Sequence, residues 1–124
     1  MSNCARLATP SYLSMKSADL FIELTAIYRK HGWQLRRVLL RPETRVEVQS
    51  LLPGDLVVRE AEFDALWFSR PSHNNREAWE LRLLAQTQYA LFETFEADET
   101  EEERDDLRLE MEARLRDYLT TDKR

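Results

Sequence analysis

The sequence contains very little glycine and cysteine. Its 124 residues include two glycines and one cysteine. Loops that cradle phosphate groups need clustered glycines, because the backbone must approach the ligand closely, and Gly32 and Gly54 stand far apart. With Cys4 alone, one chain can form neither an internal disulfide nor a zinc site built of thiolates. These absences exclude P-loop and dinucleotide-binding motifs and favour a reducing compartment.

Long apolar runs are absent too. No segment approaches the roughly eighteen apolar residues of a membrane-spanning helix, and the first ten residues lack the apolar stretch of a signal peptide. We therefore expect a soluble cytoplasmic protein with no membrane partner. Hydrophobic residues nevertheless make up 43% of the sequence, which at this length is typical of one packed domain. The predicted organisation is a flexible lead-in over residues 1–16, a single α+β domain over 17–120 and a disordered tail over 121–124.

The stretch 78–96 is the best-marked strand pattern in the chain. Trp79, Leu81 and Leu83 are spaced two residues apart, which is the period of a pleated strand with a buried face. A hairpin alone is marginal in water, so this one needs neighbours. The sequence predicts an antiparallel meander of strands at about 64–70, 79–85 and 89–96, with residues 33–40 as a fourth strand on an unassigned edge. The apolar pattern of that fourth strand shifts near Arg36 and Arg37, which indicates a β-bulge or a change of twist. Residues 56–58 pair briefly or lie in a loop.

Two helices are predicted, one on each side of the strand region. The first begins with Ser17 as its cap and ends at Gly32, where a Schellman motif would fold Trp33 back onto Tyr28. The second begins at a capping box formed by Thr100 and the glutamate three residues later, and it runs to about residue 119, with Glu112 on its outward face. Residues 43–52 form either a short helix or another strand. Pro42 suits a first helical turn and favours the helix, whereas Val46 and Val48 favour the strand.

The predicted fold class is therefore α+β, with an antiparallel sheet of about four strands and the N- and C-terminal helices packed mainly on one face. The other face or an edge of the sheet would then be left for a partner, and a homodimer is the commonest solution.

The loop 70–76 concentrates side chains that an active site would use. Histidine transfers protons near neutral pH, asparagine amides hold an oxyanion, and arginines grip a carboxylate or phosphate. The same polar residues also suit an ordinary strand connection, and no nucleophile motif accompanies them. Two tryptophans on the flanking strands either line a pocket beside the loop or belong to the core. The candidate binding residues are Arg70, His73, Asn75, Arg76, Trp67 and Trp79; no catalytic residue, metal ligand or cofactor is assigned.

The charges are unevenly distributed along the chain. Residues 1–82 hold 12 Lys/Arg and 10 Asp/Glu, whereas residues 83–124 hold 6 and 13. A nucleic-acid face is not favoured, because the sequence pI is about 5.1. The acidic run from Glu93 to Asp106 has no glycine turn of the kind that a calcium loop needs. A basic run precedes and follows Trp33; its members are Arg29, Lys30, Arg36, Arg37, Arg41 and Arg45.

In size, pI and helix–sheet–helix order, the chain is similar to the small acidic chaperones of secreted bacterial effectors. That resemblance implies a chaperone-like homodimer, with residues 43–52 in the place of that family's internal dimerisation helix. The predicted function is a non-catalytic protein-interaction or adaptor module. The alternative is a small-molecule- or anion-binding protein, or an enzyme, with its site at the loop 70–76.

Overall fold

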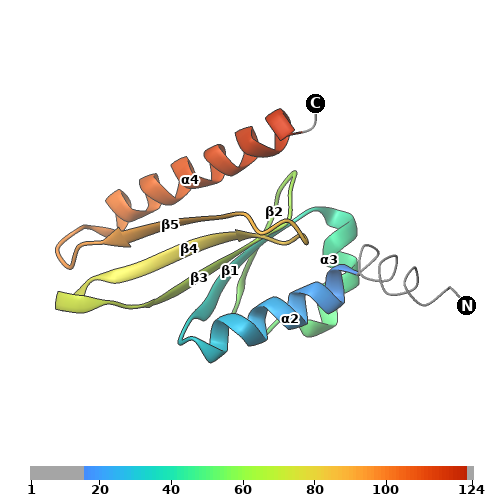
Figure 1. The fold of residues 1–124 in the computed structure, drawn as a ribbon, viewed down its shortest axis with the longest axis horizontal. Helices are drawn as coiled ribbons and strands as arrows, with labels where there is room; N and C mark the ends of the chain where they lie inside the picture. Colours follow the sequence, from blue (N-terminus) through green and yellow to red (C-terminus); the bar gives the residue numbers. More distant parts are fainter. Residues whose placement is uncertain (1–15, 123–124) are drawn as a thin grey trace, which may run out of the picture.

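The computed structural model describes residues 16–122 and shows a five-stranded sheet with helices on both faces (Figure 1). The predicted lead-in 1–16 lies outside this range except for Lys16, and of the predicted tail only residues 123 and 124 lie outside it. In chain order the elements are α2 (Ser17–Lys30), β1 (Gln34–Leu40), α3 (Pro42–Val48), the 3-10 helix η1 (Gln49–Leu51), β2 (Val57–Glu60), β3 (Ala65–Pro71), the 3-10 helix η2 (His73–Asn75), β4 (Glu77–Leu83), β5 (Ala90–Phe95) and α4 (Glu101–Asp122).

The sheet has the strand order β2-β1-β3-β4-β5. The predicted antiparallel meander is confirmed in β3, β4 and β5, and the bulge is confirmed by a shift of register between Leu35 and Arg37. The prediction of about four antiparallel strands is wrong, because β2 pairs with β1 in parallel and makes the sheet mixed. A parallel pair needs a crossover, which α3 and η1 supply, and a four-residue strand is too short to show a period in the sequence.

The turn between α2 and β1 has the predicted Schellman geometry. The Trp33 amide donates to the Tyr28 carbonyl at 2.9 Å and the Gly32 amide donates to the Arg29 carbonyl at 3.0 Å. Gly32 has a φ of 87°, which a residue without a Cβ adopts readily. Ser17 is the first residue of α2, whose N-cap is the preceding lysine, so the cap prediction is wrong at this end.

The two long helices cover opposite faces of the sheet. Leu66 and Phe68 of β3 pack in one apolar cluster with residues of α2, whereas Trp67 packs in a second cluster with Met111 and Leu115 of α4. Figure 1 shows the same arrangement, with α4 on one side of the strands and α2 and α3 on the other. The prediction that both helices lie mainly on one face is therefore wrong.

The physical reason lies in the burial of β3. Its first five residues are all buried, so both of its faces need cover. A strand buried on both sides reads as a continuous apolar run instead of an alternation. The run from Ala65 to Phe68 in the sequence has that character.

Asp64 ties the start of β3 to the end of β1 and the start of α3. Its buried carboxylate accepts hydrogen bonds from the Arg41 amide at 2.8 Å, from Arg41 Nη2 at 2.9 Å and from the Thr44 hydroxyl at 2.7 Å. Because α3 begins directly after Arg41, this carboxylate joins the end of β1 and the first turn of α3 to the start of β3.

Asp64→Ala is expected to lower the free energy of unfolding by about 3 kcal/mol, since it leaves an amide, a hydroxyl and a guanidinium without their buried acceptor. Urea unfolding measures the effect. Glu62→Ala is the matched control, because Glu62 is exposed and its ion pair with Arg116 spans 3.3 Å at the surface; it should cost under about 1 kcal/mol. Equal losses in the two variants would contradict the role of Asp64.

Candidate functional site

The two arginines of the predicted loop 70–76 are held by other parts of the chain. Arg70 Nη1 donates to the His31 carbonyl at 2.7 Å, and its guanidinium lies 4.5 Å from the ring centroid of Trp33. Arg76 Nε donates to Glu96 at 3.0 Å. Both side chains therefore fasten the end of the β3–β4 hairpin to its neighbours.

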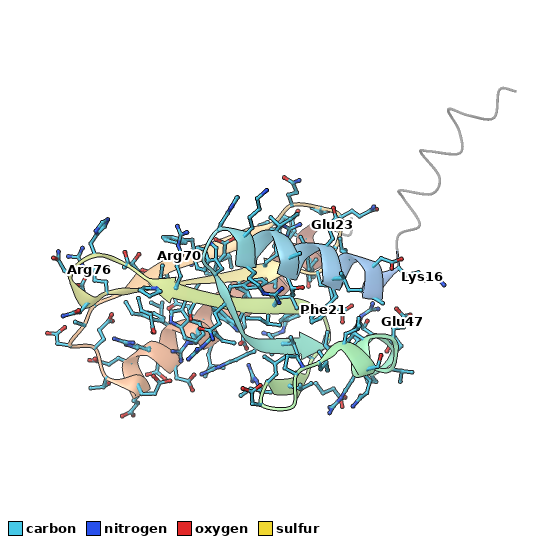
Figure 2. All side chains as sticks on the ribbon, turned by 90° about the horizontal axis from the view of Figure 1, so that it is seen from below. Lys16, Phe21, Glu23, Glu47, Arg70 and Arg76 are labelled. Atoms are coloured by element: carbon cyan, nitrogen blue, oxygen red, sulfur yellow. The ribbon has the colours of Figure 1, made fainter. Side chains whose placement is uncertain are left out.

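The turn itself is exposed. His73 and Asn75 lie in η2 at the tip of the hairpin, and both residues are exposed to solvent. Asn74 and Asn75 have φ values of 59° and 62°, a conformation that asparagine tolerates better than most residues. Figure 2 shows Arg76 at the end of the molecule opposite Lys16. The two asparagines of the loop therefore suit the backbone conformation of the turn.

The two predicted tryptophans lie in the core beneath α4. Trp67 is fully buried and donates from Nε1 to Glu112 at 2.8 Å. Trp79 donates from Nε1 to Glu77 at 2.8 Å, and its ring centroid lies 5.8 Å from that of Trp67. The structure brings the tryptophans together with each other, but the loop residues stand apart from them at the hairpin tip.

The outer edge of β5 has no pairing strand in the part of the chain described. Ala90–Phe95 end the sheet, and Phe92 on this strand is 56% exposed. Beneath α4, several apolar residues near this edge are only partly buried: Tyr89, Leu91, Leu107 and Tyr118. Phe95, the last residue of β5, is fully buried, so the cover over this strand is uneven along its length.

The opposite edge of the sheet differs in shape. β2 pairs with the second half of β1, so residues 34–36 of β1 have no strand beside them on that side in the part of the chain that the structure describes. At this gap lies an open groove of about 1020 Å³, which we call the edge groove. Its walls come from α2, from the first half of β1, from the segment before β2 and from the first half of α4. The residues that line it include Ile22, Arg29, Arg36, Arg37, Val57, Trp79, Arg104 and Arg108.

Arginines dominate the α4 side of the edge groove. Arg108 is 2% exposed; it donates to Glu101 at 2.9 Å and to Asp105 at 3.1 Å, and its guanidinium lies 4.1 Å from the ring centroid of Trp79. Arg37 donates to the same Asp105 at 3.2 Å. Partial burial acts to raise the pKa of Asp105, but the hydrogen bonds and charges of the two arginines outweigh it and hold that pKa below its ordinary value.

A smaller cavity of about 400 Å³ lies between α2 and β4, on the face of the sheet that α2 covers. The Tyr28 hydroxyl donates to Glu80 there. Burial, followed by the hydrogen bond to Glu80, raises the pKa of Tyr28 above its ordinary value. Tyr28 therefore stays protonated and serves as a hydrogen-bond donor instead of a base.

Within residues 16–122, no three or more His, Cys, Asp or Glu side chains are placed to hold a metal ion. In the same range, no helix is both long enough and apolar enough to cross a membrane.

Comparison with models of protein families, with curated proteins and with solved structures found no match.

Sequence reasoning missed the polar stripe on the inner side of α4. Glu112 was expected on the outward face, but it is buried and accepts hydrogen bonds from Trp67 and from Arg59. The available signal was spacing: Glu101, Asp105, Arg108 and Glu112 follow steps of four, three and four, which place them on one helical face.

Arg70→Ala is expected to lower the free energy of unfolding by about 1 kcal/mol, because it removes one hydrogen bond to a backbone carbonyl and the stacking on Trp33. His73→Ala, an exposed change in the same loop, should leave stability within about 0.5 kcal/mol of wild type. Thermal and urea unfolding measure both. Equal stability of the Arg70 variant and wild type would show that these contacts do not support the hairpin.

Asp105 should make folding sensitive to acid. Because its pKa is lower in the folded chain than in the unfolded chain, its contribution to stability is complete above the unfolded pKa, about 3.9, and is lost as pH falls through the folded pKa. Asp105→Asn should therefore lose less stability than wild type between about pH 5 and pH 2. Urea midpoints at each pH provide the measurement, and Asp106→Asn controls for the change in net charge. Parallel curves for wild type and Asp105→Asn would contradict the assignment.

Proposed function

We propose that this protein is a non-catalytic protein-interaction module of the cytoplasm that forms a homodimer through the free edge of β5. The observation that carries the proposal is the six-residue strand Ala90–Phe95, unpaired on one side in the described chain, with Phe92 exposed at its middle. A row of free backbone donors and acceptors beside an exposed aromatic is a template for pairing with another strand.

The strand pattern supports a symmetric pairing. Two copies related by a two-fold axis perpendicular to the sheet pair antiparallel, so the residue on the axis lies opposite its own counterpart. With Phe92 on the axis, the two rings meet and Leu91 lies opposite Glu93 of the second copy. With Glu93 on the axis, two carboxylates would face each other, which is destabilising. The favoured register therefore centres on Phe92.

The position of α4 supports the same dimer. This helix contacts both β4 and β5. A two-fold axis perpendicular to the sheet keeps the α4 helices of both copies on the same face of the joined sheet. There they would cover the partly buried residues Tyr89, Leu91, Leu107 and Tyr118 near the β5 edge.

The two edges of the sheet are not equally protected. Natural edge strands avoid pairing by being short or by carrying lysine, proline or a bulge. β2 is short, four residues, and two of these are Arg59 and Glu60. β5 has six residues without lysine or proline, and its pairing with β4 has no shift of register. This asymmetry supports β5 over β2 as the site of assembly.

The proposal retains a chaperone-like interaction module but places the dimer contact on β5 instead of residues 43–52. The predicted helix in that segment is confirmed as α3 and η1. Thr44 and Val48 of α3 are buried and α3 packs against α2, which leaves mainly polar side chains and Val46 on its outer face.

Phe92→Lys is expected to convert a dimer of twice the 14.8 kDa chain mass into a monomer, because it places two positive charges together on the axis. Light scattering after gel filtration at micromolar concentration measures the mass. Val46→Lys is the matched control, since Val46 is an apolar residue 78% exposed on α3; it should remain dimeric. A monomeric wild type, or loss of the dimer in both variants, would refute the proposal.

A cysteine cross-link tests the register. In a Cys4→Ser background, Phe92→Cys places two thiols opposite each other, where paired strands have Cα atoms about 4.5–5.5 Å apart, within the range of about 4.4–6.8 Å that a disulfide spans. Mild oxidation should yield a covalent dimer, whereas Val57→Cys at the other edge should not. A dimer that Phe92→Cys fails to cross-link would place the contact on another surface.

A further inference from the structure

The edge groove lies where the sheet is incomplete. β1 spans Gln34–Leu40, but β2 begins only opposite Arg37. On the side of β2, the backbone of residues 34–36 therefore has no strand partner within the described chain. A strand entering here would continue the line of β2, with α2 on one side of it and the first half of α4 on the other.

The groove is positively charged although the chain is not. Five arginines line it, Arg29, Arg36, Arg37, Arg104 and Arg108, against Asp55, Glu77 and Glu101. Asp105 beside the groove pairs with Arg37 and Arg108, which still leaves arginine in excess, whereas the whole chain has a net charge of −5. No ion pair joins Arg29 or Arg36 to an acid among residues 16–122. Arg36 Nη1 donates to the Gln34 side chain at 3.4 Å, and its guanidinium lies 6.0 Å from the ring centroid of Trp79, but neither contact neutralises its charge. Both guanidiniums can therefore pair with an outside carboxylate.

Apolar side chains accompany these charges. Ile22 on α2 is 51% exposed and Val57 at the start of β2 is 49% exposed, and both line the groove. Side chains of an added strand point alternately to the two faces. One set would meet Ile22 and Arg29 on the α2 side, and the other would meet Arg37 and the α4 arginines.

We propose that the edge groove binds an acidic, extended segment of a partner protein, which adds to the free half of β1 in line with β2. Backbone hydrogen bonds supply the docking, as in other cases of strand addition. The arginines select acidic side chains by charge complementarity.

The groove fits a polypeptide better than a nucleic acid. Single-stranded nucleic acids need exposed rings on which bases stack. The aromatic residues that line the groove include Trp33 and Trp79, which are 9% and 4% exposed, so neither offers a ring face of that kind. Unpaired backbone groups, in contrast, are what an extended peptide satisfies.

The groove is independent of the proposed dimer, because β1 and β5 are separated by β3 and β4. A dimer through β5 would have one groove near each end of its continuous sheet. Two grooves allow bivalent binding of a partner that carries two acidic segments.

Fluorescence anisotropy with a labelled peptide of alternating glutamate and valine tests the proposal. The peptide should bind wild type, and Arg29→Glu combined with Arg36→Glu should weaken binding about tenfold or more and favour a lysine–valine peptide instead. Arg45→Glu combined with Arg114→Glu is the matched control, since it makes the same change of charge at exposed positions outside the groove; it should bind the acidic peptide about as wild type does.

Three competitors separate the possible ligands. An acidic peptide methylated on alternate backbone nitrogens should compete poorly, because it cannot complete the strand pairing. Inorganic phosphate and an oligothymidylate should not displace the labelled peptide at matched ionic strength. Undiminished competition by the methylated peptide, displacement by either anion, or no binding of the acidic peptide would overturn the proposal.

The Phe92→Lys variant, expected to be monomeric, should still bind the acidic peptide. Failure of the dimer proposal can therefore be distinguished from failure of peptide binding in the edge groove.

Discussion

Burial of β3 on both faces is the constraint on which the rest of the structure depends. Alternate residues of this strand point into two different apolar clusters, so a single layer of helix cannot cover them. α2 closes one side and α4 closes the other. β3 is the middle strand, so its register with β1 and β4 decides which side chains of those strands point to each face. Trp79 of β4 lies opposite Ser69, and Arg37 of β1 lies opposite Trp67.

Covering both faces leaves the edges of the sheet as the places where backbone groups stay unpaired. A helix shields side chains on a face but does not pair the amides of an edge strand. The two edges differ because β2 pairs with only the second half of β1, whereas the outer side of β5 has no strand partner along its whole length within residues 16–122. Both interaction proposals follow from this single feature of the topology.

The polar network beneath α4 shows how charged residues enter a core of this kind. Arg108 is buried against the face of Trp79, with two carboxylates as partners, and Glu112 is buried with Trp67 and Arg59 as donors. Buried charges persist when they are paired and hydrogen-bonded. Glu101 and Asp105 neutralise much of the buried positive charge, while Arg29 and Arg36 of the edge groove have no ion pair among residues 16–122.

Local patterns in the sequence determined the helix ends at Gly32 and Thr100, the β3–β5 meander and the bulge in β1, because each depends on residues close together in the chain. Tertiary structure alone decided the pairing of β2, the division of the helices between two faces and the burial of Glu112. Of the loop residues that the sequence predicts for binding, Arg70 and Arg76 anchor the hairpin and Asn75 lies in its turn. The arginines of the edge groove come from three separate elements. Those outcomes depend on contacts between distant segments, which strand period and capping motifs do not encode.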